Sequence, residues 1–231
     1  MNKQKLEGFI NRYSLGGEVD SVVIKSTDDS LTVRMISDDK SLLGEVSAAN
    51  IEFPNGSFGI YTTSQLKQFL TVLDDEITVK ETPGSLQFSD NLSKINYMLA
   101  SEIVIPDVPA LKELPEFNIE VTLGADVVNR FIKSKGALTE SDTFTFVSKG
   151  EKSEIILGYS TVNTNRISLQ VTAKTDGDVS PISFSARYLK QILMANKDSS
   201  YSVLKISTDG LAYVSFSDSE YKSSYYLVQI Q

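Results

Sequence analysis

The sequence predicts an α+β protein made of two similar halves, each with two helices backing antiparallel sheets. Three observations lead to this prediction: four segments with helical hydrophobic periodicity, alternating apolar and polar residues in much of the remaining chain, and motifs that occur twice in the same order. At 231 residues the chain can form one large domain or two of about 110 residues. The repeated motifs favour two.

Three short motifs recur along the chain. The pairs are residues 10–13 and 128–131, residues 64–70 and 187–193, and Asp90-x-x-x-Lys94-x-x-Tyr97-x-Leu99 and Asp218-x-x-x-Lys222-x-x-Tyr225-x-Leu227. The spacing between the copies grows slowly along the chain, which is typical of two homologous halves that differ by small loop insertions. Any one match alone is a weak signal, but the common order indicates an internal duplication.

Four segments place apolar residues at the i, i+3, i+4 spacing of an amphipathic helix. We predict helices over residues 2–13, 63–75, 125–136 and 185–198, with Ser185 as the N-cap of the last. Because two of these segments fall in each half, each half carries a helix pair.

Between the helical segments the hydrophobic period changes to two, which indicates half-buried strands. The clearest examples are residues 31–35, 95–99, 119–123, 144–146 and 167–171. Pro-Gly and Asp-Gly pairs separate several of the strands and are typical of hairpin turns.

A linker is predicted where the first half ends. Residues 105–117 contain three of the six prolines, which disfavours both a helix and a central strand. We therefore expect an N-terminal domain over residues 1–104, an interdomain linker over 105–117, and a C-terminal domain over 118–231.

The composition argues against an enzyme. The chain has no histidine and no cysteine, which removes the commonest general base, thiolate nucleophiles and most zinc sites, and it has no P-loop motif. Neighbouring acidic residues could in principle hold Mg²⁺, but they are more typical of solvated turns. These pairs are Asp28-Asp29, Asp38-Asp39 and Asp74-Asp75. We expect no catalytic residues, no cofactor and no metal.

No apolar run approaches the roughly 20 residues that cross a bilayer, so we expect a soluble chain with no membrane partner. The first residues lead into a charged amphipathic stretch rather than the apolar segment of a secretory signal. We therefore expect a cytoplasmic location.

Charge is distributed unevenly along the chain. The helical segments contain ten basic and five acidic residues and so carry a net charge of +5, which leaves −13 for the rest of a chain that totals −8. The basic residues are Lys3, Lys5, Arg12, Lys67, Arg130, Lys133, Lys135, Arg187, Lys190 and Lys197. Polar helix faces normally carry Lys and Arg, so this pattern has an ordinary explanation. Alternatively, the helices form a positive surface that contacts phosphates without reading bases.

Three stretches in this order carry a family resemblance: residues 58–106, residues 154–193, and the closing run Tyr225-Tyr226-Leu227-Val228. Together with the duplication and the Pro-rich linker, they resemble the sliding DNA clamp family, and most closely the DNA polymerase processivity factors of T-even-like bacteriophages. The resemblance covers most of the chain and rests on order and length, because clamps have no short diagnostic motif.

The resemblance implies a head-to-tail homotrimer, a six-domain ring with twelve helices around a central hole. Helices spaced 8–10 Å apart would enclose a hole of roughly 30–38 Å, which is wide enough for duplex DNA. The implied function is to encircle DNA without base specificity and to tether the replicative DNA polymerase. The implied partners are double-stranded DNA, that polymerase, an ATP-dependent clamp loader and the late-transcription machinery. If the chain is phage-encoded, its location would be the host cell cytoplasm.

The resemblance also suggests where partner proteins dock, on the linker and the last strand. The positions are Val108, Leu111, Leu114, Tyr226, Val228 and Ile230. Apolar linker residues equally often hold a linker against its own domain.

A different class of function shares the same fold signals. A non-catalytic structural or adaptor protein built from duplicated β-rich domains, such as a virion component, would give the helix charge no functional role. Replacing Lys67, Arg130, Lys133 and Lys190 by Glu would leave such a protein active, whereas a clamp would stop stimulating its polymerase.

Overall fold

The computed structural model describes residues 1–231 except Asp29, Lys112, Asn163, Asp176 and Gln231. Its described residues form an α+β fold with four α-helices, and the predicted fold class is confirmed. The helices are α1 (Lys3–Ser14), α2 (Thr63–Leu70), α3 (Ala125–Ala137) and α4 (Ala186–Ala195). The chain divides into two compact units, unit 1 with residues 1–109 and 218–223, and unit 2 with residues 110–217 and 224–231.

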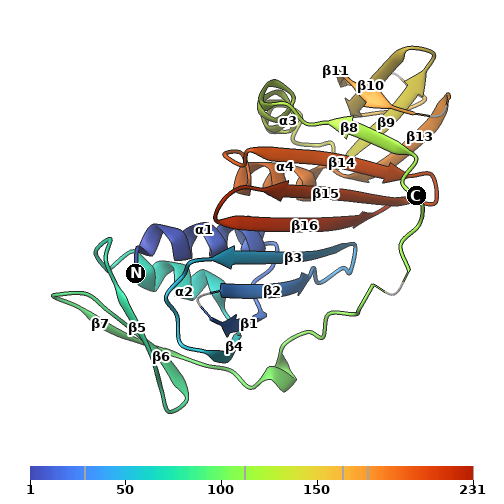
Figure 1. Ribbon diagram of the computed structural model, residues 1–231. Helices are drawn as coiled ribbons and strands as arrows, with labels where there is room; N and C mark the ends of the chain where they lie inside the picture. The colour runs from blue at the N-terminus through green and yellow to red at the C-terminus, as the bar shows by residue number, and fades with distance from the viewer. Residues whose placement is uncertain (29, 112, 163, 176, 231) are drawn as a thin grey trace. The chain divides into compact units, whose positions relative to one another are not determined.

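Unit 1 contains two antiparallel sheets. One has the order β3-β2-β1-β4 and the other the order β5-β6-β7. The strands are β1 (Val22–Thr27), β2 (Ser30–Ile36), β3 (Leu42–Ala49), β4 (Gly56–Ile60), β5 (Thr78–Thr82), β6 (Ser85–Ser89) and β7 (Lys94–Met98). Figure 1 shows α1 and α2 side by side behind the first of these sheets.

Unit 2 also contains two sheets, with the orders β11-β10-β9-β13 and β12-β8-β14-β15-β16. The strands are β8 (Ile119–Thr122), β9 (Thr143–Lys149), β10 (Lys152–Leu157), β11 (Ile167–Val171), β12 (Ala173–Lys174), β13 (Val179–Ser185), β14 (Tyr201–Ser207), β15 (Leu211–Ser217) and β16 (Tyr221–Val228). The first three residues of β16 belong to unit 1. Helix α3 packs against α4 and β11, as α1 packs against α2 and β3 in unit 1.

The two halves correspond strand by strand. The order β3-β2-β1-β4 in the first half matches β11-β10-β9-β13 in the second, and β5-β6-β7 matches β14-β15-β16. In the second half, β8 precedes α3 and pairs with β14. In the first half, Asn2 precedes α1 and forms an antiparallel bridge with Glu76, just before β5. The duplication inferred from the repeated motifs is therefore present in the fold.

The repeated aspartates have the same local role. In the turn before β7, Asp90 Oδ1 accepts hydrogen bonds from the backbone N–H groups of Leu92 and Ser93, at 2.8 and 2.6 Å. Asp218 Oδ1 accepts from the N–H groups two and three residues later at 2.8 and 2.7 Å. A carboxylate that closes its own turn explains why this residue occurs in both motifs.

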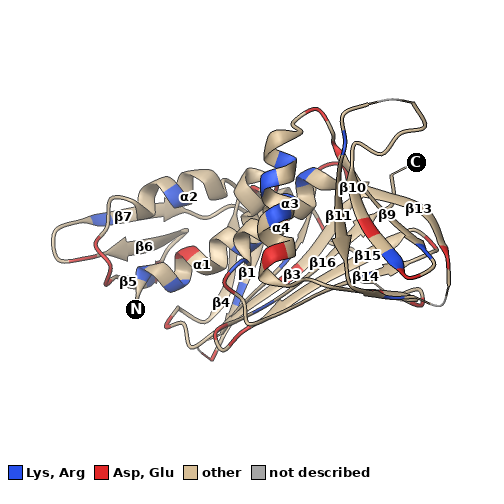
Figure 2. Ribbon diagram, turned by 90° about the horizontal axis from the view of Figure 1, so that it is seen from above, with Lys and Arg blue, Asp and Glu red and all other residues tan. Residues whose placement is uncertain are grey.

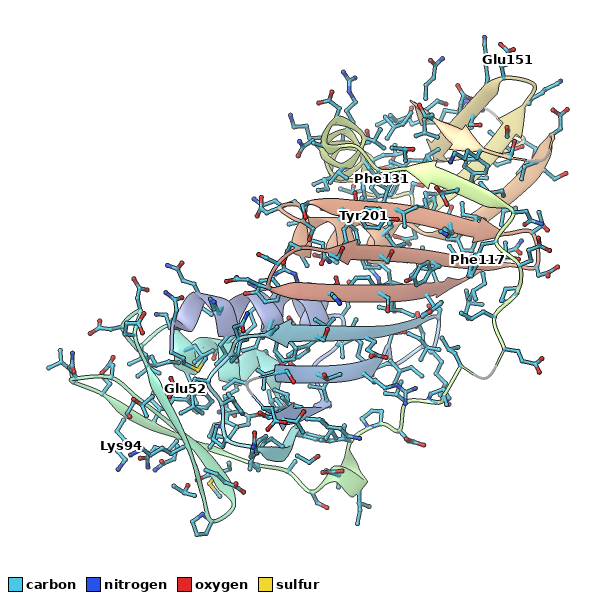
Figure 3. All side chains as sticks on the ribbon, in the orientation of Figure 1. Glu52, Lys94, Phe117, Phe131, Glu151 and Tyr201 are labelled. Atoms are coloured by element: carbon cyan, nitrogen blue, oxygen red, sulfur yellow. The ribbon has the colours of Figure 1, made fainter. Side chains whose placement is uncertain are left out.

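Each unit has its own apolar core beneath its helix pair. In unit 1, Phe9 and Tyr13 of α1 stack edge-on and are fully buried. In unit 2, Phe131 of α3, labelled in Figure 3, packs edge-on against the buried Phe144 of β9. Burying the aromatic side of each amphipathic helix holds the helix on its sheet and leaves the polar side outward.

The predicted limits agree with the observed ones to within one residue for α1 and α3, whereas the predicted α2 and α4 run five and three residues past the observed ends. Ser185 is confirmed as the N-cap of α4, since its hydroxyl accepts a hydrogen bond from Tyr188 N at 3.2 Å. Helix α2 ends at Leu70, not at residue 75, and the next three residues continue with i→i−3 hydrogen bonds. These bonds keep Leu73 on the buried side. The helical spacing of apolar residues therefore continues for three residues after the α-helix has ended.

The predicted linker has no helix or strand in its described residues. The division between the units falls between Pro109 and Ala110. Arg34 of β2 donates a hydrogen bond to Pro109 O at 2.6 Å, which fixes the start of this segment against unit 1. The domain limits 1–104, 105–117 and 118–231 stay a prediction.

Candidate nucleic-acid interface

The basic residues predicted to face DNA are concentrated on the four helices. Nine of the ten lie within α1 to α4, and Lys197 follows α4. Only two acidic residues, Glu7 and Asp126, lie within the same helices. Figure 2 shows Lys and Arg positions on both helices of each unit. Because the acidic residues at 74, 75 and 198 lie outside the observed helices, the helices are more basic than the sequence segments suggested.

Two lysines of α1 are engaged within unit 1. Lys3 is buried, and its Nζ donates a hydrogen bond to Leu73 O in the turn after α2. Lys5 is half-buried, and its Nζ lies 2.8 Å from a carboxylate oxygen of Glu220. The first contact joins the two helices of the unit and the second neutralises a charge at the helix surface.

Arg12 is the centre of a second set of contacts in unit 1. Its guanidinium lies 3.8 Å from the ring centroid of Tyr221, donates to Gly8 O at 3.0 Å, and lies 3.5 Å from Asp218 Oδ2. The Tyr221 hydroxyl donates to Lys5 O at 2.9 Å. We call Lys5, Gly8, Arg12, Asp218 and Tyr221 the Arg12 cluster. These contacts attach residues 218–223 to α1.

Burial and nearby charge act in opposite directions on Tyr221. Burial raises the pKa of its phenol, while the Arg12 guanidinium favours the phenolate and opposes this rise. Gly8 makes the approach possible, because a Cβ at this position would lie 2.6 Å from the Tyr221 hydroxyl oxygen. The helix surface is thus shaped to receive this segment.

Two of the basic residues in unit 2 also have local partners. Lys135 is buried, donates to Thr139 O at 2.9 Å and lies 3.9 Å from Asp142. Arg187 is exposed but lies over the Tyr188 ring, 4.8 Å from its centroid, and donates to the Tyr188 hydroxyl at 3.1 Å.

The remaining five basic residues are unengaged. Lys67 and Lys190 are half-buried, and Arg130, Lys133 and Lys197 are exposed. None of the five has a hydrogen bond or an ion pair with any residue that the structure describes. Long cationic side chains of this kind can reach a phosphate without first breaking a protein contact.

The residues predicted to dock partners are divided between the units. Val108 belongs to unit 1 and lines a cleft of about 250 Å³ together with Val23 and Ile105. The other five belong to unit 2, where Leu111, Leu114, Val228 and Ile230 are exposed and Tyr226 is half-exposed.

An aromatic row on the unit 2 sheet was not foreseen from the sequence. The ring of Tyr213 on β15 lies 5.0 Å from that of Tyr226 on β16 and 5.8 Å from that of Phe117, which is labelled in Figure 3. Alternation along β15 places Tyr213 on the less buried face, but only the pairing of the strands shows that it meets Tyr226. Tyr226 is therefore one member of a stacked set.

The acidic pairs singled out in the sequence do not form a metal-binding group among the described residues. The carboxylates at 38, 39, 74 and 75 lie in loops or turns, and Asp29 lies outside the described residues. No three acidic side chains in the described part of the chain are placed to share a metal ion. No helix in that part is long and apolar enough to cross a membrane.

Comparison with solved structures identifies the fold. The structure is similar to the crystal structure of the proliferating cellular nuclear antigen from Entamoeba histolytica, a sliding clamp, with a TM-score of 0.76 and 14% sequence identity. The match covers 100% of this chain and 96% of that chain. No protein-family model and no curated protein matches the sequence. At this level of identity the likeness concerns the fold, and this chain has the duplicated sliding-clamp fold along its whole length.

Proposed function

We propose that this chain is one protomer of a homotrimeric sliding clamp that encircles duplex DNA and tethers a replicative DNA polymerase. The carrying observation is the full-length clamp fold, in which the helices of both repeats contain more basic than acidic residues. Retention would come from the closed ring and sliding from weak phosphate contacts, so the clamp itself needs no chemistry. The fold of a non-catalytic clamp supports this non-enzymatic role.

The proposal includes the partners that such a ring requires. An ATP-dependent clamp loader would open the ring, and the polymerase would dock on the linker and last strand, beside the aromatic row of Phe117, Tyr213 and Tyr226. A T-even-like phage origin, a role in late transcription and a place in the host cytoplasm belong to the same proposal. They rest on the sequence resemblance.

The duplication suggests which strands close the ring. Within unit 1, the last residue of β3 is bonded to the residue that precedes β16. Ala49 N donates a hydrogen bond to Glu220 O at 2.9 Å. The counterparts of β16 and β3 in the other copies of the repeat are β7 and β11, and each lies at the edge of its sheet. We therefore expect β7 of one protomer to pair with β11 of the next.

The side chains on these two edges suit such a junction. On β11, Ile167, Leu169 and Val171 are half-buried on one face, and the residues between them are exposed. On β7, Met98 is 69% exposed at the end of the strand. Apolar side chains left partly exposed at an open edge favour a further strand.

Cross-linking tests this pairing cleanly, because the chain has no cysteine of its own. A variant with Asn96→Cys on β7 and Ser168→Cys on β11 should give covalent dimers and trimers with a short bismaleimide. A control with Lys80→Cys on β5 and the same Ser168→Cys should stay monomeric on a denaturing gel. Equal cross-linking of the control would contradict the strand assignment while leaving the clamp proposal standing.

Solution mass and loading test the function itself. Light scattering over a dilution series should give a mass near three protomers. With a polymerase and loader from a T-even-like phage, the protein should remain on nicked circular DNA and dissociate after linearisation. A persistent monomer that is never retained on circular DNA would instead favour the structural or adaptor protein considered above.

A further inference from the structure

We propose that unit 2 supplies most of the phosphate-binding charge of each protomer, so that the ring carries three strongly basic patches, not six. This inference rests on the proposed clamp function and sharpens it. The unit 2 patch consists of Arg130 and Lys133 on α3, Lys190 on α4, and Lys197 just after α4.

Unit 1 has little charge to offer, although its helices carry four basic residues. Lys3 and Arg12 are buried, with the ammonium group on a backbone carbonyl and the guanidinium against Tyr221 and Asp218. Moving either group to a phosphate would leave the buried Leu73 carbonyl or the partly buried Asp218 carboxylate without its cation, which costs more than an exposed phosphate contact returns.

The other two cations of unit 1 are Lys5 and Lys67, and only Lys5 has an acidic partner among the described residues. Lys5 is paired with Glu220 at 2.8 Å. Lys67 is thus the one unengaged basic residue on these two helices, and the half-exposed Glu7 of α1 offsets one positive charge in their total. The helix surface of unit 1 is therefore close to neutral for a passing phosphate.

The unit 2 patch keeps its charge. Its four side chains have no hydrogen bond or ion pair within the described chain, and three of them are exposed. The one acid inside these two helices is Asp126, which lies in the first turn of α3 where it complements the helix dipole. Asp198 follows Lys197 directly in the sequence and offsets one positive charge after α4. A net positive surface therefore remains over α3 and the face of α4 that bears Lys190.

Matched charge-neutral variants test this asymmetry. The unit 2 variant is Arg130→Gln with Lys133→Gln, and the unit 1 variant is Lys5→Gln with Lys67→Gln. The charge control is Lys149→Gln with Lys152→Gln, which removes two exposed lysines from a unit 2 hairpin away from the helices. All three variants change the net charge equally.

The readout is fluorescence anisotropy of a short labelled linear duplex over a salt series, which requires neither loader nor polymerase. Each phosphate contact contributes about 0.9 to the slope of log K against log salt. The unit 2 variant should lower the slope by about 2 for each protomer in contact, the unit 1 variant by at most about 1, and the control should leave it unchanged.

The outcomes separate the inference from the function beneath it. If the unit 1 variant or the control lowers the slope as much as the unit 2 variant, the three-patch arrangement is wrong and the clamp proposal stands. If the unaltered protein forms no trimer and shows no salt-dependent binding, both are wrong. Unfolding midpoints that match the unaltered protein verify that each variant is folded.

Discussion

Helices α2 and α4 occupy the same place in the two repeats, but they are capped from different places. The Ser185 hydroxyl caps α4 from the adjacent position, whereas Thr62 at the start of α2 makes no side-chain capping bond. There the carboxylate of Asp20, 44 residues away, accepts from Ser64 N at 2.7 Å. The repeats thus keep the backbone arrangement and change the side chain that satisfies it.

The aspartate turns show the same division. Asp90 and Asp218 close their turns alike with one oxygen. The second oxygen of Asp90 accepts from the backbone N of Asp74 at 2.7 Å, while that of Asp218 faces Arg12. In the second copy the spare oxygen therefore serves a side chain distant in sequence, so a repeated residue need not keep all of its contacts.

The largest expected effect concerns Gly59 on β4. Gly59 O accepts from Ala100 N, and Ser183 O on β13 likewise accepts from Ile230 N, both at 2.9 Å. A Cβ at Gly59 would lie 2.2 Å from Ala100 O, so the backbone must shift. Gly59→Ala should lower the free energy of unfolding by about 3 kcal/mol in urea titrations. Ser183→Ala, at the corresponding position of the second repeat, should lower the free energy of unfolding by about 1 kcal/mol or less. Equal losses in the two variants would show that a side chain is tolerated equally at both positions.

The next effect concerns the ion pair between Arg12 and Asp218, which has no counterpart at Asp90. Arg12→Met should lower the free energy of unfolding by about 2–3 kcal/mol, because it leaves a partly buried Asp218 without its cation. A double-mutant cycle with Asp218→Asn should give a coupling energy of about 1 kcal/mol or more in urea titrations. Additive effects would place the contribution of Arg12 in its packing on Tyr221 instead.

The caps provide a smaller and closely matched comparison. Ser185→Ala and Asp20→Ala should each lower the free energy of unfolding by about 1 kcal/mol, because each removes a capping acceptor. Thr62→Ala should change it by a few tenths of a kcal/mol at most. Thermal unfolding monitored by circular dichroism checks all three. A large loss for Thr62→Ala would contradict the assignment of the α2 cap to Asp20.

The smallest effect is a pH dependence. Three backbone N–H groups, from Asp74, Leu92 and Ser93, bond the Asp90 carboxylate and lower its pKa. The carboxylate therefore stabilises the folded state above the unfolded pKa of about 3.9, and this contribution is lost as pH falls through the lowered folded value. In urea titrations at neutral pH, Asp90→Asn should have a lower free energy of unfolding than the unaltered protein. The difference between the two free energies should shrink below about pH 4. A difference that stays constant with pH would exclude the charge as its cause.

The sequence predicted what depends on local periodicity. All four helices, the duplicated sheets and the Ser185 cap follow from residues close together in the chain. The cap from Asp20 and the end of α2 were not predictable in this way. The first comes from a distant loop, and the second continues the apolar spacing through a different hydrogen-bond pattern.

The engagement of the basic residues was the least predictable feature. In the sequence, nothing separates the engaged cations of α1 from exposed cations on other helices. Only the tertiary partners distinguish Lys3, Lys5 and Arg12. The partners of Lys5 and Arg12 lie near the far end of the chain, so no local pattern reports them. Net charge along a helix therefore overestimates the charge that the helix can offer to a ligand.

The attachment of residues 218–223 to unit 1 has a consequence for how the protein is made. The contact between Tyr221 and Lys5 spans 216 residues of sequence. During synthesis the Arg12 side chain lacks Asp218 and Tyr221 until residues 218–223 have been translated and have emerged from the ribosome. Unit 1 therefore lacks part of its surface while most of unit 2 is being translated, and a chain cut short before residue 218 would expose that unfinished surface to chaperones and proteases.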